Sequence, residues 1–231
     1  MMAYSVKIDG KDIHRDLGAL MTNYTISPPK PQENLLQIPL RNGSLDLTEA
    51  LTGEVKYENR DINIKLQYLG YSFLDVYSKI LNYCHGKKCQ VIFDDDMGFY
   101  YEGRLSVSEF KYIKYGATFE ISGSMQPFKT SIFSSDEPWL WDPFDFETGI
   151  INSFQNIVVN GSETIKLIYQ GQRTYISITT DSQITVSYKG ESVVAGAGTT
   201  TLYEFNFDQG ENEITLSGNA TVSIIYREVS L

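Results

Sequence analysis

Apolar and polar residues alternate at every second position through much of the chain, a pattern that predicts β-strands. Residues 62–68 alternate without interruption, which is typical of a strand with one buried and one solvated face. Asp9-Gly10 stands between two short apolar stretches, and the acidic run 94–98 separates two more. Both arrangements indicate β-hairpins, because Asp-Gly suits the positive φ angles of a tight turn.

One segment has the 3.6-residue period of a helix instead. Its apolar stripe consists of Phe73, Val76, Tyr77, Ile80, Leu81 and Cys84. We expect Ser72 to cap the start and Asp75 to lie near the positive end of the helix dipole. Gly86 should end the helix, with Lys87 and Lys88 near its carbonyl end. A single helix beside many strands typically covers one end or face of a barrel or sheet.

The second half of the chain has the spacing of an all-β module. Its apolar pairs are Ile165/Leu167, Ile176/Ile178, Ile184/Val186, Phe205/Phe207, Ile214/Leu216 and Val222/Ile224. Asn160-Gly161, Lys189-Gly190 and Gly210 are expected to mark turns between them. Residues 145–231 therefore predict about eight short strands in a sandwich or jelly roll.

Charge divides the chain at a similar place. Residues 1–130 hold 15 Lys/Arg and 16 Asp/Glu (net -1), whereas residues 131–231 hold 4 and 13 (net -9). This asymmetry suggests two modules with different neighbours, or an acidic half that is simply solvated. Prolines and both tryptophans gather near the break, so we expect a linker at 131–144 in which Trp139 and Trp141 pack between the modules. The predicted domains are thus 1–130 and 145–231.

The composition excludes several classes of protein. A net charge of -10 argues against a nucleic-acid partner. No apolar run exceeds five residues, so no segment approaches the ~20 needed to cross a bilayer. The first residues lack the apolar stretch of a signal peptide. We therefore expect no membrane partner.

Chemistry-bearing residues are sparse. The histidines are His14 and His85, and the sequence contains no recognisable catalytic motif. Cys84, His85 and Cys89 could supply three zinc ligands, but their spacing is not that of a zinc ribbon and no fourth ligand is near. The consecutive carboxylates 94–96 alternate sides and cannot converge on calcium, so a solvated hairpin tip is expected. We predict no enzyme activity, no cofactor and no metal.

Residues 23–38 do not suit a central strand, because prolines lack the N–H that a sheet interior needs. We expect a protruding arm with a proline-rich tip between two apolar limbs, docked on another subunit. A long surface loop packed on its own barrel is the alternative. The predicted ring-interface residues are Tyr24, Ile26, Pro28, Pro29, Pro31, Leu35, Leu36 and Ile38.

The segment that follows this arm carries a resemblance to a known family. Residues 38–49, IPLRNGSLDLTE, resemble the signature IPxRxGxLDLTE of phage distal tail proteins. Four further stretches match in the same order: Gly53 to Ile62, His85 to Lys87, Phe93 to Arg104, and Gly218 to Arg227. The similarity covers nearly the whole chain.

The resemblance implies a mainly β fold. An N-terminal split β-barrel with one α-helix and a protruding β-hairpin arm would be followed by a C-terminal jelly-roll or galectin-like β-sandwich. It also implies a structural virion protein of a long-tailed phage or prophage, assembled in the host cytoplasm and located at the tail tip or baseplate. The protein would form a homo-hexameric ring hub. Its partners would be the tail tube protein, a tail-tip or tail-associated lysin-type protein, and receptor-binding or baseplate proteins.

Other functions remain open at this point. A carbohydrate-binding, lectin-like adhesion module would need an exposed aromatic platform with polar neighbours. A tail tube subunit shares barrel folds and ring assembly, although the second β module argues against it. A glycosidase or wall hydrolase would need a carboxylate pair that 29 acidic residues do not single out. The length of 231 residues leaves no room for an inserted carbohydrate-binding domain.

Overall fold

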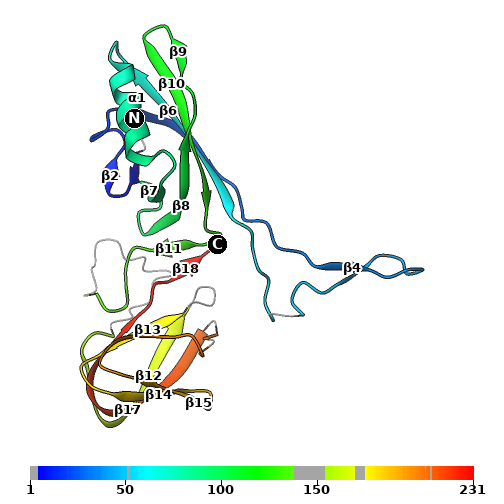
Figure 1. Cartoon of the computed structure of the whole chain (residues 1–231), viewed down its shortest axis with the longest axis vertical. Helices are drawn as coiled ribbons and strands as arrows, with labels where there is room; N and C mark the ends of the chain where they lie inside the picture. The colour runs from blue at the N-terminus through cyan, green and yellow to red at the C-terminus, as the bar shows by residue number, and fades with distance from the viewer. Residues whose placement is uncertain (1–4, 51–52, 138–153, 170–174, 206, 209) are drawn as a thin grey trace. The chain divides into compact units, whose positions relative to one another are not determined.

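A computed structural model describes the chain except for residues 1–4, 51–52, 138–153, 170–174, 206 and 209 (Figure 1). The chain divides into two compact units, residues 1–129 with Leu231 and residues 130–230. Within the described residues the fold is mainly β, as predicted, and its helix belongs to the first unit. No helix of this part of the chain is long and apolar enough to cross a membrane.

The first unit is a nearly closed, barrel-like sheet with a single α-helix among its described residues. Its strands lie in the order β2-β1-β7-β8-β10-β6-β3, and β9 pairs with β10. A separate hairpin of β4 and β5 belongs to the arm. The strand bounds are β1 (Val6–Ile8), β2 (Lys11–Asp12), β3 (Leu20–Ile26), β4 (Leu35–Gln37), β5 (Ser44–Asp46), β6 (Arg60–Leu69), β7 (Lys88–Phe93), β8 (Phe99–Val107), β9 (Lys111–Ile113) and β10 (Gly116–Met125).

The uninterrupted alternation of residues 62–68 is confirmed in β6. Ile62, Ile64 and Leu66 are at most 1% exposed, while the residues between them lie outside the core. Burial of each such side chain stabilises the folded state by roughly 1.5–3 kcal/mol. The inward face of β6 is therefore a principal part of the core of the first unit.

Both predicted hairpins of the first unit are present. Asp9 and Gly10 have φ angles of 45° and 80°, the positive values that a tight turn between β1 and β2 requires. β7 and β8 pair on either side of residues 94–98. Local turn chemistry thus determines both connections.

A buried carboxylate organises the chain just after β2. Asp12 is 4% exposed and accepts hydrogen bonds from the Ser5 hydroxyl (2.8 Å) and from the backbone N–H groups of His14 (2.8 Å) and Arg15 (2.9 Å). Burial raises the pKa of this carboxyl, but these hydrogen bonds outweigh burial and hold the pKa below its usual value. Asp12 is therefore ionised in the folded protein at neutral pH.

The predicted helix is α1 (Phe73–Cys84), and its apolar stripe faces the core. Val76, Ile80 and Cys84 are buried, and Ile80 is fully buried. The prediction for its start was wrong: Ser72 makes no side-chain capping bond, because its φ and ψ of -89° and 30° lie outside the extended region that a cap needs. At the other end Gly86 has the predicted positive φ of 73°.

Aromatic packing connects β3 to β7. The Tyr24 ring of β3 stacks on Phe93 of β7 at 4.3 Å between ring centroids, and the Tyr24 hydroxyl donates to Asp95. Burial and the neighbouring Asp95 raise the pKa of Tyr24 to about 12, so its hydroxyl remains a donor. β3, at one edge of the sheet, is thereby joined to the end of β7.

The acidic hairpin tip is accessible to solvent, as predicted, but its carboxylates also bind other parts of the first unit. Asp94 accepts from the Ser5 N–H at 2.9 Å, and Asp96 pairs with Lys129 at 2.8 Å. Asp95 accepts from Tyr24. The three carboxylates diverge toward three partners, so the tip fastens separate parts of the first unit.

The second unit is a β-sandwich with a core of its own. β14 and β13 pair with successive halves of β17, and β12 pairs with β17 along its whole length. β15 and β16 form the outer strands. The bounds of its strands are β12 (Ile157–Tyr169), β13 (Ile176–Thr180), β14 (Ile184–Tyr188), β15 (Glu191–Ala195), β16 (Gly198–Leu202) and β17 (Gly210–Ile225). Two short strands, β11 (Lys129–Ser131) and β18 (Val229–Ser230), pair with each other outside this sheet.

Two long strands contribute to both layers of the sandwich, in place of the short strands expected. Asn160-Gly161 was predicted as a turn, but it lies inside β12, where Gly161 pairs with Gly218 of β17. These glycines have φ angles of 90° and 144°. Only glycine adopts such angles readily, so the paired strands can bend here and continue into the second layer.

The six predicted apolar pairs of this unit are all buried, at 9% exposure or less. Phe205 and Phe207 differ in one respect, because they follow β16 in irregular backbone. Lys189-Gly190 forms the predicted turn, with φ angles of 47° and 87° between β14 and β15. The buried residues of this half were thus predicted correctly, although some strand boundaries were not.

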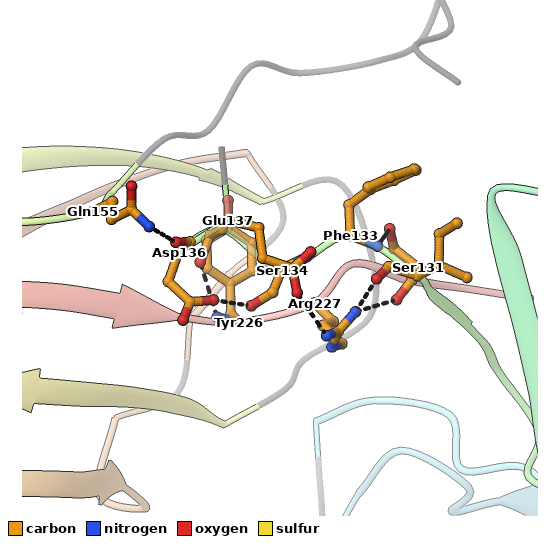
Figure 2. Close-up of polar contacts among 10 residues, drawn as sticks. Ser131, Phe133, Ser134, Asp136, Glu137, Gln155, Tyr226 and Arg227 are labelled. Atoms are coloured by element: carbon orange, nitrogen blue, oxygen red, sulfur yellow. Dashed lines mark hydrogen bonds and ion pairs between the residues drawn. The ribbon is translucent and has the colours of Figure 1, made fainter. Parts of the chain in front are cut away.

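Residues 131–137, which we expected to begin a linker, are bonded to the end of β17 (Figure 2). Ser135 donates to the Tyr226 carbonyl at 3.0 Å through its N–H, and to the Ile224 carbonyl at 2.7 Å through its hydroxyl. Arg227 donates to the Ser131 carbonyl at 3.2 Å and also to the Ile132 carbonyl. This segment is therefore part of the second unit. Trp139 and Trp141, and the remainder of the predicted linker, lie outside the described residues.

Candidate assembly interface

The arm begins and ends where β3 and β6 leave the sheet (Figure 1). Pro28, Pro29 and Pro31 do not form its tip. Pro31 bridges Tyr57, the Glu58 N–H donates to the Lys30 carbonyl, and the Gln32 N–H donates to the Lys56 carbonyl, both at 2.8 Å. The proline-rich residues 28–31 therefore form one limb of a longer arm that runs from residue 27 to residue 59.

The turn of the arm lies further along the chain, within residues 38–43. β4 and β5 pair beside it, from Leu35–Asp46 to Gln37–Ser44. Leu40 and Gly43 have positive φ angles of 65° and 76°. Asn42-Gly43 is a dipeptide typical of turns, but the tip was predicted at the proline cluster instead. The family-like run 38–49 is thus the outer end of the arm.

Four large apolar side chains stand exposed on this outer end. Leu35 and Leu36 are 51% and 49% exposed, Ile38 is 38% exposed, and Leu40 is fully exposed. Successive residues of a strand point to opposite faces, so Leu35 and Leu36 make both faces of the β4–β5 hairpin apolar. An apolar surface of this kind is typical of an interaction site.

Tyr24 and Ile26 do not belong to that exposed set. Both lie in β3, where they pack against the core of their own unit. The period of β3 turns them toward the barrel, so their burial requires no neighbouring subunit. We therefore restrict the predicted ring interface to the arm residues from Pro28 to Leu40 and add Leu40, which the sequence analysis missed.

A buried cation stands at the root of the arm. Arg60 begins β6, is 5% exposed, and its guanidinium lies 5.4 Å from the centre of the Tyr101 ring. Its Nε and Nη2 atoms have no hydrogen-bond partner. Burial lowers the pKa of this guanidinium, an effect that the nearby Tyr101 opposes. The cation–π contact with Tyr101 offsets part of the cost of taking this charge out of water.

The two cysteines and His85 lie among structural contacts of the first unit, whereas His14 is exposed. Cys84 and Cys89 are buried and unbridged, and burial raises the pKa of their thiols to about 11 and about 12. Both thiols are therefore protonated at neutral pH, and a protonated thiol is a poor nucleophile. The Nδ1 atom of His85 accepts from the Val107 N–H at 3.0 Å. Among the described residues, no three His, Cys, Asp or Glu side chains are placed to hold a metal ion.

Comparison with solved structures finds a full-length match. One match is the crystal structure of the SPP1 Dit (gp 19.1) protein, described as a paradigm of the hub adsorption apparatus in Gram-positive infecting phages. The two chains are 10% identical, the alignment covers 99% of each, and the TM-score is 0.60. The likeness shows the fold. No protein family model matches the chain, and no curated protein does so.

Proposed function

We propose that this chain is a structural protein of a long-tailed phage or prophage and that it forms a hexameric ring hub at the end of the tail. The hub would join the tail tube to the baseplate or tail tip, with the tail tube protein on one side and a tail-tip or lysin-type protein on the other. Support comes from the fold, which resembles that of the Dit hub protein over 99% of both chains.

The exposed arm is the observation that carries the ring proposal. Full burial of a Leu or Ile side chain contributes ~1.5–3 kcal/mol, so the four apolar residues of the outer arm can supply several kcal/mol before ordering costs are subtracted. A surface on one subunit that docks on a different surface of the next gives a head-to-tail contact. Such contacts close into rings when the rotation permits.

The second unit would hold receptor-binding or baseplate proteins. It has its own core and nearly all of the net negative charge of the chain, -9 of -10. A separately folded, highly charged unit can bind peripheral proteins without disturbing the ring. The site of action would be the virion tail, after assembly in the host cytoplasm.

Light scattering and electron microscopy of the purified chain test this proposal. Six copies have a mass of 6 × 26.2 = 157.2 kDa. The double variant Leu35→Ser/Leu36→Ser should remain folded and lose the ring. Val194→Ser is the matched control, because Val194 is 58% exposed and lies in the second unit. It should leave the ring intact.

Replacing residues 31–57 by an Asn-Gly turn gives a second, stronger perturbation. Lys30 and Glu58 are already joined by a hydrogen bond, so a two-residue turn can connect them without strain on β3 or β6. A folded monomer is expected. Rings that persist in both arm variants would refute the interface, and long tubes formed by the intact chain would identify a tail tube subunit instead.

A further inference from the structure

A partly exposed strip of tyrosines and hydroxyl groups lies on the outward-facing side of the second unit. Its members lie on β13 and β16 and immediately beside them. Opposite residues of the two strands pair as Ser177–Thr201 and Thr179–Thr199. The residues of this β13–β16 strip are Tyr175, Ser177, Thr179, Thr199, Thr201 and Tyr203.

Two tyrosine rings at one end form an exposed aromatic corner. Tyr175 and Tyr203 are 58% and 67% exposed, and their ring centroids lie 5.0 Å apart at an interplanar angle of 63°. Tyrosines that are this exposed contribute little to the core of their own unit. Their ring faces are apolar and electron-rich, whereas their hydroxyls are polar, so they suit a ligand with both kinds of surface.

A ladder of hydroxyl groups continues from the tyrosines along the two strands. Ser177 and Thr201 share a hydrogen bond of 2.9 Å, and so do Thr179 and Thr199. A hydroxyl has one donor and two acceptor positions, so each pair still has capacity to bind a ligand. The mutual bonds hold the oxygens in a fixed row, which reduces the cost of ordering them on binding.

The strip carries no charge, although it lies in the acidic half of the chain. Neither 175–180 nor 198–203 contains a charged residue, whereas residues 131–231 have a net charge of -9. An anionic polymer would be repelled by the surrounding field. The ligand that fits is therefore neutral, with hydroxyl groups and apolar C–H faces.

The strip is long enough for several sugar units. Four residue steps along β13 span about 14 Å at ~3.4 Å per residue. We propose that the β13–β16 strip binds a neutral glycan, with sugar C–H faces on the Tyr175 and Tyr203 rings and sugar hydroxyls on the Ser/Thr ladder.

This binding goes beyond the hub function and does not depend on it. The test uses the intact full chain on an array of neutral hexose and N-acetylhexosamine oligosaccharides, with poly(glycerol phosphate) as the anionic comparison. Titration calorimetry with the best-retained oligosaccharide then gives its affinity. We expect retention of at least one neutral oligosaccharide and none of the polyanion.

Variants assign the binding to the strip. Tyr175→Ala and Tyr203→Ala should each weaken binding at least tenfold. Tyr175→Phe, which keeps the ring, should change it less than threefold. Tyr112→Ala is the matched control, because Tyr112 is 71% exposed and lies in the first unit. It should have no effect, and far-ultraviolet circular dichroism should confirm that each variant is folded.

The outcomes separate this proposal from the ring hub. Tyr175→Ala and Tyr203→Ala should retain the ring mass, and the arm variants should retain glycan binding. Absence of binding to every neutral oligosaccharide would overturn the glycan proposal. So would equal losses in Tyr112→Ala and the strip variants, or a strip that is occupied by another tail protein and by no sugar.

Discussion

The helix α1 offers the sharpest test of the core of the first unit. Ile80 is fully buried, its neighbour Lys79 is exposed on the same helix, and Leu81 is partly buried against the core. Ile80→Ala removes three buried carbons and leaves a cavity in a packed cluster. Substitutions of this kind cost ~2–5 kcal/mol.

We expect a loss near the middle of that range, about 3–4 kcal/mol, for Ile80→Ala. Leu81→Ala should cost about 1–2 kcal/mol, because part of that side chain already contacts water. Lys79→Ala should stay within about 0.5 kcal/mol. Differential scanning calorimetry is the suitable assay, because the two units can unfold in separate transitions and the three substitutions affect the first unit.

For a unit of this size, 3–4 kcal/mol corresponds to a decrease in Tm of about 10 °C or more. The transition of the second unit should remain unchanged and so serves as an internal control. Equal small shifts for all three variants would refute the packing of α1 against the sheet. A larger shift for Lys79→Ala than for Ile80→Ala would mean that the opposite face of the helix is buried.

Three further substitutions test single features. Asp12 has a lowered pKa in the folded state, so it stabilises the fold above the unfolded pKa of about 3.9, and this stabilisation is lost as pH falls through the folded pKa. Asp12→Asn should therefore lower the Tm at pH 7 and reduce the further decrease in Tm below pH 4. Arg60→Met should leave the free energy of unfolding unchanged or raise it, since an apolar side chain of similar length replaces a buried charge. Arg60→Ala should lower the free energy of unfolding by about 2–4 kcal/mol. A large decrease in the free energy of unfolding for Arg60→Met, measured by chemical denaturation, would contradict this. Gly218→Ala should destabilise the second unit more than Gly161→Ala, because an added Cβ at 218 would lie 3.2 Å from Ile184 while the site at 161 is open; equal losses by calorimetry would mean that backbone strain alone decides both.

Sequence patterns within a few residues correctly predicted the elements that depend on nearby residues. The stripe of α1, the Asp9-Gly10 turn and the inward pairs of the second unit each depend on neighbours within a few residues. Asn160-Gly161 shows the limit of such signals. The same dipeptide suits a turn or a bend, and pairing of Gly161 with Gly218, 57 residues away, decides between them.

The arm shows a different limit. Prolines 28, 29 and 31 correctly indicated a segment outside the main sheet, but they were taken for its tip. Proline favours extended backbone as strongly as it favours turns, so the cluster formed a straight limb. The exposure of Tyr175 and Tyr203 was not predicted, because each lies just outside a strand, where alternation does not determine the direction of a side chain.

The proline limb has a consequence for assembly in the proposed ring. Prolines cannot donate to a growing sheet, so this limb is a poor template for the strand-to-strand pairing that exposed hairpins invite. They also restrict the backbone before any partner is met, and the hydrogen bonds from Gln32 to Lys56 and from Glu58 to Lys30 hold the two limbs together. The apolar residues at the outer end are therefore presented on a stiff support. Docking of the arm therefore costs less conformational entropy. The surface that the arm binds is then determined more by side chains than by the backbone, namely by those of Leu35, Leu36, Ile38 and Leu40.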